Sequence, residues 1–176
     1  MAAERHQPPE LRGGRVLLRP IRAVDGDRLL EILREPGVAR WWGVHDAERV
    51  RQDLIEPTDE VAYAIESGGE LIGAVTYYEE PTPEYRHAGL DIFLTTDRHG
   101  RGLGSEALRL VARHLFDERG HHRLTIDPAA ANERAIRAYA RVGFRPVGVM
   151  REYERAPDGE WRDGLLMDLL PADLRP

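Results

Sequence analysis

Residues 99–105 read His-Gly-Arg-Gly-Leu-Gly-Ser; a strand-like alternation of apolar residues precedes them, and a helical pattern begins within them. Three glycines in so short a turn let the backbone approach a ligand closely and direct its amide hydrogens toward it. The helix that begins there adds the positive end of its dipole, which favours an anionic group such as a pyrophosphate. Arg101 adds a positive charge beside the turn. The alternative is a plain glycine-rich turn whose arginines only keep the surface soluble.

Two common nucleotide-binding patterns do not fit this turn. The dinucleotide-binding pattern Gly-x-Gly-x-x-Gly requires a third glycine, but Gly102 and Gly104 are followed by Ala107. The ATP-binding loop requires Gly-Lys-Ser/Thr, and this sequence contains no lysine. Both patterns are therefore excluded.

Outward from the turn, the hydrophobic pattern alternates between strands and helices. Strands are expected at 16–21, 60–66, 71–78, 87–94, 123–126, 144–150 and 161–169, and helices between Asp25 and Pro36 and over 46–54, 103–118 and 133–142. Pro36-Gly37 is expected to stop the first helix, and Asn132 to cap the last. Antiparallel pairs come first and a strand–helix–strand crossover lies in the middle, so the order predicts an α+β fold with a mixed sheet.

The composition is that of one folded domain. The chain has 176 residues, of which 41% are hydrophobic and 32% charged, and it has no apolar stretch near the ~20 residues that span a bilayer. We expect residues 1–14 to form a flexible N-terminal tail, which lacks the apolar core of a secretory signal, and residues 15–176 to form a single domain. The absence of cysteine excludes disulfides and thiolate nucleophiles and favours a cytoplasmic location.

The charge balance points away from nucleic acid. The formal net charge is −6, whereas nucleic-acid binding depends on neutralising phosphates. A long-range negative field would instead attract a small cationic partner. His121-His122 has no suitably spaced third ligand, so no metal is expected. No membrane contact is expected either, and monomer and homodimer both stay open.

Two motifs resemble one known family. Gly102 and Gly104 match the glycines of Gln/Arg-x-x-Gly-x-Gly/Ala, the acetyl-CoA-binding signature of the GNAT superfamily, with His99 at its leading position. Residues 132–144, NERAIRAYARVGF, resemble the later GNAT segment Asn-x-x-Ala-x-x-x-Tyr-x-x-x-Gly-Phe. The resemblance covers roughly residues 15–170, a range that includes the start of the domain and the early strands.

The resemblance implies a GNAT fold: a twisted, mostly antiparallel sheet of about seven strands that splays at the middle, flanked by about four helices. It implies acetyl-CoA as co-substrate, with its pantetheine arm paired to the free backbone of the splayed strand. The expected cofactor-binding residues are Ile92, Phe93, Leu94, His99, Gly100, Arg101, Gly102, Leu103, Gly104, Ser105, Asn132, Ala135 and Arg137.

Acetyl transfer to an amine needs a group that removes a proton and a group that stabilises the departing sulfur. Asp91 is the candidate base. Aspartate is disfavoured inside strands, and yet Asp91 lies in a strand, at the point where the GNAT resemblance implies that the sheet splays. The alternatives are that it acts through a water, that it only binds an ammonium group, or that it is a solvent-facing strand residue. Tyr139 is the candidate acid, and the alternative is a core tyrosine. Without cysteine, transfer would be direct, in a ternary complex.

The acceptor side resembles the aminoglycoside 6'-N-acetyltransferases, in which aspartates at positions matching Asp91 and Asp127 meet the polycationic drug. The expected acceptor is therefore the 6'-amine of an aminoglycoside antibiotic, whose acetylation gives resistance. The substrate-binding candidates are Trp41, Trp42, Glu79, Asp91, Asp127 and Asp158, of which one tryptophan is a candidate sugar platform and the loop glutamates also fit a solvated surface.

Three other functions stay open. The start of the domain, Arg15–Pro20, is similar to enzymes that acetylate protein N-termini, including ribosomal proteins. Siderophore-synthesis acyltransferases, which acylate a lysine side chain or a hydroxylamine, share the central motifs. A non-catalytic acyl-CoA-binding module is the third, and the presence of Asp91 and Tyr139 argues against it.

Overall fold

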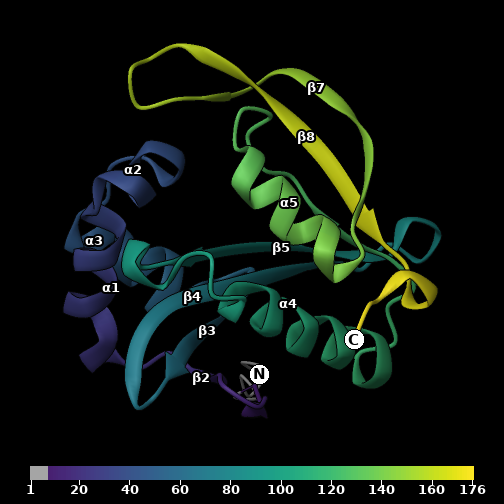
Figure 1. The fold of residues 1–176 in the computed structure, drawn as a ribbon, viewed down its shortest axis with the longest axis horizontal. Helices are drawn as coiled ribbons and strands as arrows, with labels where there is room; N and C mark the ends of the chain where they lie inside the picture. Colours follow the sequence, from purple (N-terminus) through teal and green to yellow (C-terminus); the bar gives the residue numbers. More distant parts are fainter. Residues whose placement is uncertain (1–7) are drawn as a thin grey trace.

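The computed structural model describes residues 8–176, which form one eight-stranded sheet with helices packed on it (Figure 1). The strands are β1 (Leu11–Arg12), β2 (Leu17–Pro20), β3 (Glu60–Ser67), β4 (Glu70–Glu80), β5 (His87–Leu94), β6 (Leu124–Ile126), β7 (Arg145–Arg155) and β8 (Trp161–Leu169). The helices are α1 (Gly26–Arg34), α2 (Pro36–Trp42), α3 (Ala47–Val50), α4 (Leu103–Arg113) and α5 (Glu133–Val142). The π-helical turns Arg51–Ile55 and His114–Glu118 prolong α3 and α4.

The sheet has the order β1-β2-β3-β4-β5-β6-β8-β7, and β5–β6 is its parallel pair. The predicted α+β fold with a mixed, mostly antiparallel sheet is confirmed. The described residues contain eight strands and five helices, against the expected seven and four. Among the described residues no helix has both the length and the apolar character needed to cross a membrane.

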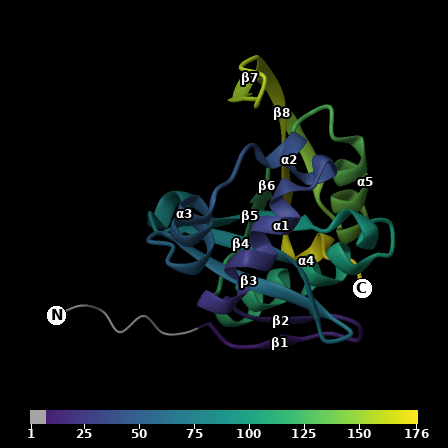
Figure 2. The same cartoon turned by 90° about the vertical axis from the view of Figure 1, so that its left-hand side faces the viewer.

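Helices cover both faces of the sheet, so two hydrophobic cores form (Figures 1 and 2). The larger core lies under α4 and α5 and includes Leu108 and Tyr139. The smaller core lies under α1, α2 and α3 and includes Phe93. Because side chains alternate along a strand, Ile92 and Leu94 of β5 pack toward the larger core while Phe93 packs toward the smaller one.

The sheet parts at its middle, as predicted. β5 pairs with β6 through only two registered pairs, Ala88↔Leu124 and Gly89↔Thr125, and β6 ends at Ile126 while β5 continues to Leu94. The N–H of Ala88 points across this junction to the Arg123 carbonyl, at 3.3 Å. Since alternate residues of a strand direct their backbone groups to the same side, Ile92 and Leu94 direct theirs into the gap.

The structure differs from the expectation at Pro36-Gly37, which ends α1 but also begins α2. Proline is well tolerated at the first position of a helix, where its missing N–H has no partner to lose. Glu35 separates the two helices because its backbone is extended, with φ −60° and ψ 130°. The consequence is that Trp41-Trp42 lies at the end of a helix.

Part of the expected N-terminal tail is folded. Leu11–Arg12 pairs antiparallel with β2, through Leu11↔Leu18 and Arg12↔Leu17. The tail prediction was therefore wrong at these two residues, whose short strand gave no periodic signal. Residues 1–7 of the expected tail lie outside the described residues.

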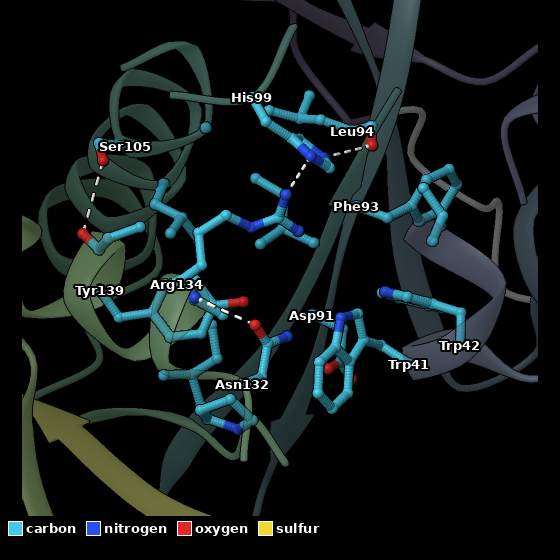
Figure 3. Close-up of a pocket in the computed structure, with 18 of the residues that line it drawn as sticks. Trp41, Trp42, Asp91, Phe93, Leu94, His99, Ser105, Asn132, Arg134 and Tyr139 are labelled. Atoms are coloured by element: carbon cyan, nitrogen blue, oxygen red, sulfur yellow. Dashed lines mark hydrogen bonds between the residues drawn. The ribbon is translucent and has the colours of Figure 1, made fainter. Parts of the chain in front are cut away.

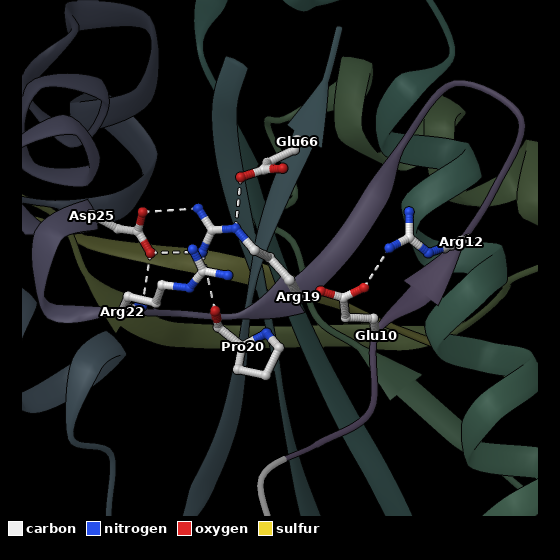
Figure 4. Close-up of polar contacts among 7 residues, drawn as sticks. All are labelled: Glu10, Arg12, Arg19, Pro20, Arg22, Asp25 and Glu66. Carbon is white, nitrogen blue, oxygen red and sulfur yellow. Dashed lines mark hydrogen bonds and ion pairs between the residues drawn. The ribbon is translucent and has the colours of Figure 1, made fainter. Parts of the chain in front are cut away.

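Asp25 does not cap α1 with its side chain. Its carboxylate accepts from two guanidinium nitrogens of Arg19, at 2.8 and 2.9 Å, and from the backbone N–H of Arg22, at 2.7 Å (Figure 4). Arg19 also donates to Glu66 at 2.6 Å. This buried cluster ties the end of β2 to β3 and to the start of α1.

Candidate active site

A cavity of about 350 Å³ lies where β5 and β6 part (Figure 3). Its walls are α2 on one side and the first half of α4 and one side of α5 on the other. Most of the residues singled out in the sequence line it: Trp41, Trp42, Asp91, Ile92, Phe93, Leu94, His99, Gly100, Gly102, Leu103, Gly104, Ser105, Asp127, Asn132, Ala135 and Tyr139. The structure thus gathers one connected site from several separate stretches of chain.

One end of the cavity is built to receive an anion. Gly100 and Gly102 have φ values of 73° and 77°, a left-handed conformation that glycine adopts without strain. The N–H of Glu106 makes the first intrahelical bond of α4, to the carbonyl of Gly102. The amides of the preceding residues 103–105 therefore stand at the positive end of α4 without a bond inside the helix.

Three arginines that the sequence analysis did not single out also line the cavity: Arg98, Arg134 and Arg141. In a chain whose cationic side chains are all arginine, nothing in the local pattern marks these three. They come from the turn and from two positions seven residues apart on α5, which share one face of the helix. Arg134 contacts His99 of the turn, so its positive charge adds to that of the helix amides at this end, whereas Arg98 is paired with Glu70.

Two of the expected cofactor-binding residues do not line the cavity. The backbone carbonyl of Arg101 accepts from Arg15 at 2.8 Å, and this contact holds the turn to the segment before β2. Arg137 lies on α5 and pairs with Glu133 at 3.0 Å. The sequence pattern could not separate these arginines from those that face the cavity.

The other end of the cavity is acidic, and Asp91, Asp127 and Glu154 line it. Asp91 is accessible through the open cavity, although protein surrounds it on the remaining sides. Burial, with the negative charges of Asp127, Glu60 and Glu154, raises the pKa of Asp91 to about 7. A carboxyl group in this state can exchange a proton near neutral pH.

Glu154 reaches the cavity because β7 is irregular. The pairing of β7 with β8 shifts register between Met150 and Glu154, and Glu152 has a φ of 49°, in the left-handed region. The side chain of Asp163 accepts from the Glu152 N–H at 2.8 Å and so supports this bulge. Beyond the bulge, the Tyr153 hydroxyl donates to Asp127. No sequence pattern predicts a bulge here, so Glu154 was not among the expected site residues.

Tyr139 lies across the gap from Asp91, on α5 and in the larger core. Asn132 caps this helix by accepting from the Ala135 N–H at 3.2 Å, as expected. Burial, and then the charge of Asp91, raises the pKa of Tyr139 above its ordinary value. The hydroxyl therefore stays protonated and can donate a hydrogen bond into the cavity.

The two tryptophans of α2 have different surroundings. Trp42 packs edge-on against Phe93, with 4.9 Å between ring centroids, and belongs to the smaller core. Trp41 carries the Arg40 guanidinium over its ring, 4.5 Å from the centroid. Both line the cavity, and Trp41 is the one whose ring is not committed to the core.

Glu79 and Asp158, expected to bind substrate, lie outside the cavity. Hydrogen bonds from Arg119 and His121, at 2.8 and 2.7 Å, lower the pKa of Glu79 to about 2 despite its partial burial. Asp158 accepts from Arg162 and from the Glu160 N–H within the β7–β8 hairpin. Both carboxylates have local structural partners. Within residues 8–176 no cluster of three or more potential metal ligands was found.

Residues 15–145 match the family described as the acetyltransferase (GNAT) domain. The chain therefore belongs to the GNAT acetyltransferases, and it is an acetyl-CoA-dependent N-acetyltransferase. It is 30% identical to the aminoglycoside N(6')-acetyltransferase type 1 of Klebsiella pneumoniae, in an alignment that covers 82% of this chain and 79% of that protein.

Solved structures agree with this family. AAC(6')-Ib in complex with paromomycin and acetyl-CoA superposes with a TM-score of 0.74 at 25% identity, over 90% of this chain and 95% of that one. The ribosomal-protein-S5-alanine acetyltransferase of Vibrio fischeri superposes with a TM-score of 0.79 at 18% identity, over 96% and 100% of the two chains. The second likeness establishes only the shared fold.

Proposed function

We propose that this enzyme acetylates a primary amine of a small polycation, with the 6'-amine of an aminoglycoside as the leading candidate. The observation that carries the proposal is that one cavity is lined by Arg134 and the helix amides beside the glycine turn and also by three carboxylates, those of Asp91, Asp127 and Glu154. Such a cavity suits a phosphate-bearing acyl donor and an acceptor with several ammonium groups. The likeness to aminoglycoside acetyltransferases at 30% identity supports the same acceptor class.

The donor end fits acetyl-CoA. The glycine turn and the amides at the start of α4 suit its pyrophosphate, and the unpaired backbone groups of Ile92, with the N–H of Leu94, suit its pantetheine arm. The Leu94 carbonyl already accepts from His99. Gly104 packs closely on β5: a Cβ there would lie 3.1 Å from Leu94 Cδ1. Bound there, acetyl-CoA supplies a thioester whose carbonyl carbon the amine attacks.

Asp91 is the proposed base. An amine in water is mostly ammonium near neutral pH, and it must lose a proton before it can attack. The transfer releases one proton overall, which Asp91 accepts, while another nitrogen proton ends on the sulfur of coenzyme A. A carboxyl group whose pKa is about 7 is matched to this exchange.

Tyr139 is proposed to assist the departing sulfur. A thiol is a stronger acid than a tyrosine whose pKa is raised (the pKa of cysteine is about 8.5), so complete transfer of the phenolic proton to the thiolate is uphill. We therefore assign to Tyr139 a hydrogen bond to the sulfur as negative charge develops there. Because no cysteine is present to carry the acetyl group, the transfer is direct, within a ternary complex.

A thiol-release assay with acetyl-CoA tests the proposal. The acceptors are kanamycin, tobramycin, peptides with free N-termini and lysine. We expect turnover with an aminoglycoside that bears a 6'-amine, at a kcat/KM at least tenfold above that of the peptides. Efficient turnover of peptides alone would assign the enzyme to protein N-terminal acetylation instead.

A further inference from the structure

His99 stands at the first position of the acetyl-CoA signature, where Gln or Arg is expected, and its surroundings fix the role of each ring nitrogen. Nε2 lies 2.9 Å from the carbonyl oxygen of Leu94. A carbonyl oxygen can only accept, so Nε2 carries the hydrogen of this bond. Burial and the nearby charge of Arg134 lower the pKa of His99, which keeps the ring neutral. Nδ1 is then left with a lone pair, as an acceptor.

The partner of Nδ1 is the guanidinium of Arg134, which reaches from α5 to the His99 ring (Figure 3). A guanidinium can only donate, which agrees with the tautomer that Leu94 imposes. The one N–H of the neutral His99 ring is therefore used in the hydrogen bond to the end of β5, and the other ring nitrogen presents a lone pair. In this state it has no donor left for a phosphate oxygen.

Arg134 has the donors that His99 lacks. It is the second residue of α5, lines the electropositive end of the cavity and is always charged. A guanidinium carries five N–H donors in a planar fork, so the bond to His99 leaves most of them available.

We propose that Arg134, oriented by His99, supplies the cationic side chain that binds the pyrophosphate of acetyl-CoA, in place of the Gln or Arg of the signature. His99 is a positioning residue that sets the direction of the guanidinium and joins it to the end of β5. The inference rests on the proposed acetyl-CoA site. It explains why a chain that departs from the signature at its first position still presents a complete phosphate-binding end.

The test measures binding rather than turnover, by calorimetric titration of the purified protein with coenzyme A. The Arg134→Ala protein should bind at least about tenfold more weakly than wild type, as expected for loss of a charge-assisted hydrogen bond. The matched control is Arg137→Ala, one turn further along α5, where the side chain pairs with Glu133 and does not line the cavity. Its affinity should stay within twofold of wild type.

Substitutions at His99 separate orientation from general packing. His99→Asn keeps an acceptor near the Nδ1 position and should retain most of the affinity, whereas His99→Leu should weaken binding. A double-mutant cycle should show that His99→Leu adds little once Arg134 is alanine. Additive losses would contradict the positioning role of His99.

A second ligand shows whether Arg134 binds the pyrophosphate or the 3'-phosphate of coenzyme A. With 3'-dephospho-coenzyme A, the loss caused by Arg134→Ala should persist; if it disappears, Arg134 binds the 3'-phosphate and the assignment is wrong. Unchanged affinity in Arg134→Ala would overturn the inference while leaving the acetyl-CoA site intact. Failure of the wild-type protein to bind coenzyme A would instead overturn the proposed function.

Discussion

At the scale of single residues, the surroundings of Asp91 decide how the enzyme should respond to pH. Three other carboxylates raise its pKa in addition to burial: Asp127, Glu60 and Glu154. The charges that attract a cationic acceptor are thus the same charges that bring the base into a useful range. Removing one of them should affect both properties.

The first prediction concerns this coupling. In wild type, kcat/KM should rise with pH through an inflection near 7, because the base must be deprotonated to accept a proton. Glu154→Gln removes a negative neighbour, so the inflection should move to lower pH while the KM for a polycationic acceptor increases. Initial rates between pH 5.5 and 9 measure both effects.

Asp91→Asn is the control for the same experiment. It should lose about 100-fold or more in kcat/KM, the usual range for a general base. Its residual rate should lack the inflection near 7. An inflection that survives in this variant would belong to the acceptor amine or to another group, and Asp91 would then not be the base.

The sequence predicted much of the site at this scale, and the reason is spacing. The glycine turn, Asn132 and Tyr139 lie within two continuous motifs, and Asp91 lies on the strand that leads into one of them. Arg134 lies at an unspecified position of the second motif and Glu154 lies outside both, and their places in the site depend on a contact with His99 and on a bulge in β7. Contacts between distant segments leave no mark in a local pattern.

At the scale of elements, Glu35 joins the helix that carries Trp41 and Trp42 to the turn that follows β5. It lies between α1 and α2, and its carboxylate accepts from the Thr95 hydroxyl at 2.6 Å and from the Thr96 N–H and hydroxyl at 2.7 and 2.6 Å. The start of α2 also packs against this turn: a Cβ on Gly37 would lie 2.5 Å from Thr96 Cγ2. The helix that carries Trp41-Trp42 is therefore anchored next to the glycine-rich turn.

The second prediction follows from this anchor. Glu35→Gln should lower the free energy of unfolding by about 1–2 kcal/mol, since a charged acceptor of three hydrogen bonds is lost. It should also raise the KM for the acceptor several-fold, because α2 loses its attachment. Chemical denaturation and steady-state kinetics measure the two effects. Glu31→Gln, on the exposed face of α1, should change neither quantity, and equal effects of both substitutions would argue against an anchor.

The misread proline belongs to the same scale. Pro36 both ends one helix and begins another, and hydrophobic periodicity cannot distinguish a stop from a stop followed by a restart. The first helical position of α2 requires a φ that the proline ring already fixes, so proline can begin this helix. The helix that carries Trp41 and Trp42 was therefore not predicted.

At the scale of the whole molecule, the buried cluster around Arg19 holds the N-terminal half together. Arg19 is 6% exposed and bridges Asp25 and Glu66, so β2, β3 and the entrance to α1 meet at one guanidinium. Burial alone would raise the pKa of Asp25, but the hydrogen bonds from Arg19 and from the Arg22 N–H lower it.

The third prediction is a loss of stability in Arg19→Met. Breaking a buried ion pair leaves Asp25 without its main partner and should cost about 3–5 kcal/mol at pH 7. Because the pKa of Asp25 is lowered on folding, the pair stabilises the fold above the ordinary carboxyl pKa and ceases to do so as the pH falls through the lowered value. The difference from wild type should therefore shrink below pH ~4.

Urea denaturation at a series of pH values measures this difference. Arg12→Met is the matched control, because Arg12 is exposed and pairs with Glu10 on the surface, where an ion pair contributes little. A gap between Arg19→Met and wild type that stays constant down to pH 3 would show that packing of the arginine stem, and not the ion pair, is what stabilises this corner.

The mixed sheet was predictable at this scale because the order of strands and helices permits few topologies, whereas its parting was expected only from the resemblance to the GNAT family. The short β1 and the bulge in β7 were not, since each depends on a neighbouring strand rather than on its own residues.

A strand that lacks a neighbour over half of its length is open to water on that side. In the free protein the amide hydrogens of Ile92 and Leu94 should exchange quickly with deuterium, while those of Asp91 and Phe93, bonded to β4, exchange slowly. A pantetheine arm lying in the gap would act as a non-peptide strand and close it. The supply of acetyl-CoA would then set how rigid the centre of the molecule is, and its depletion would loosen the protein from the middle outward.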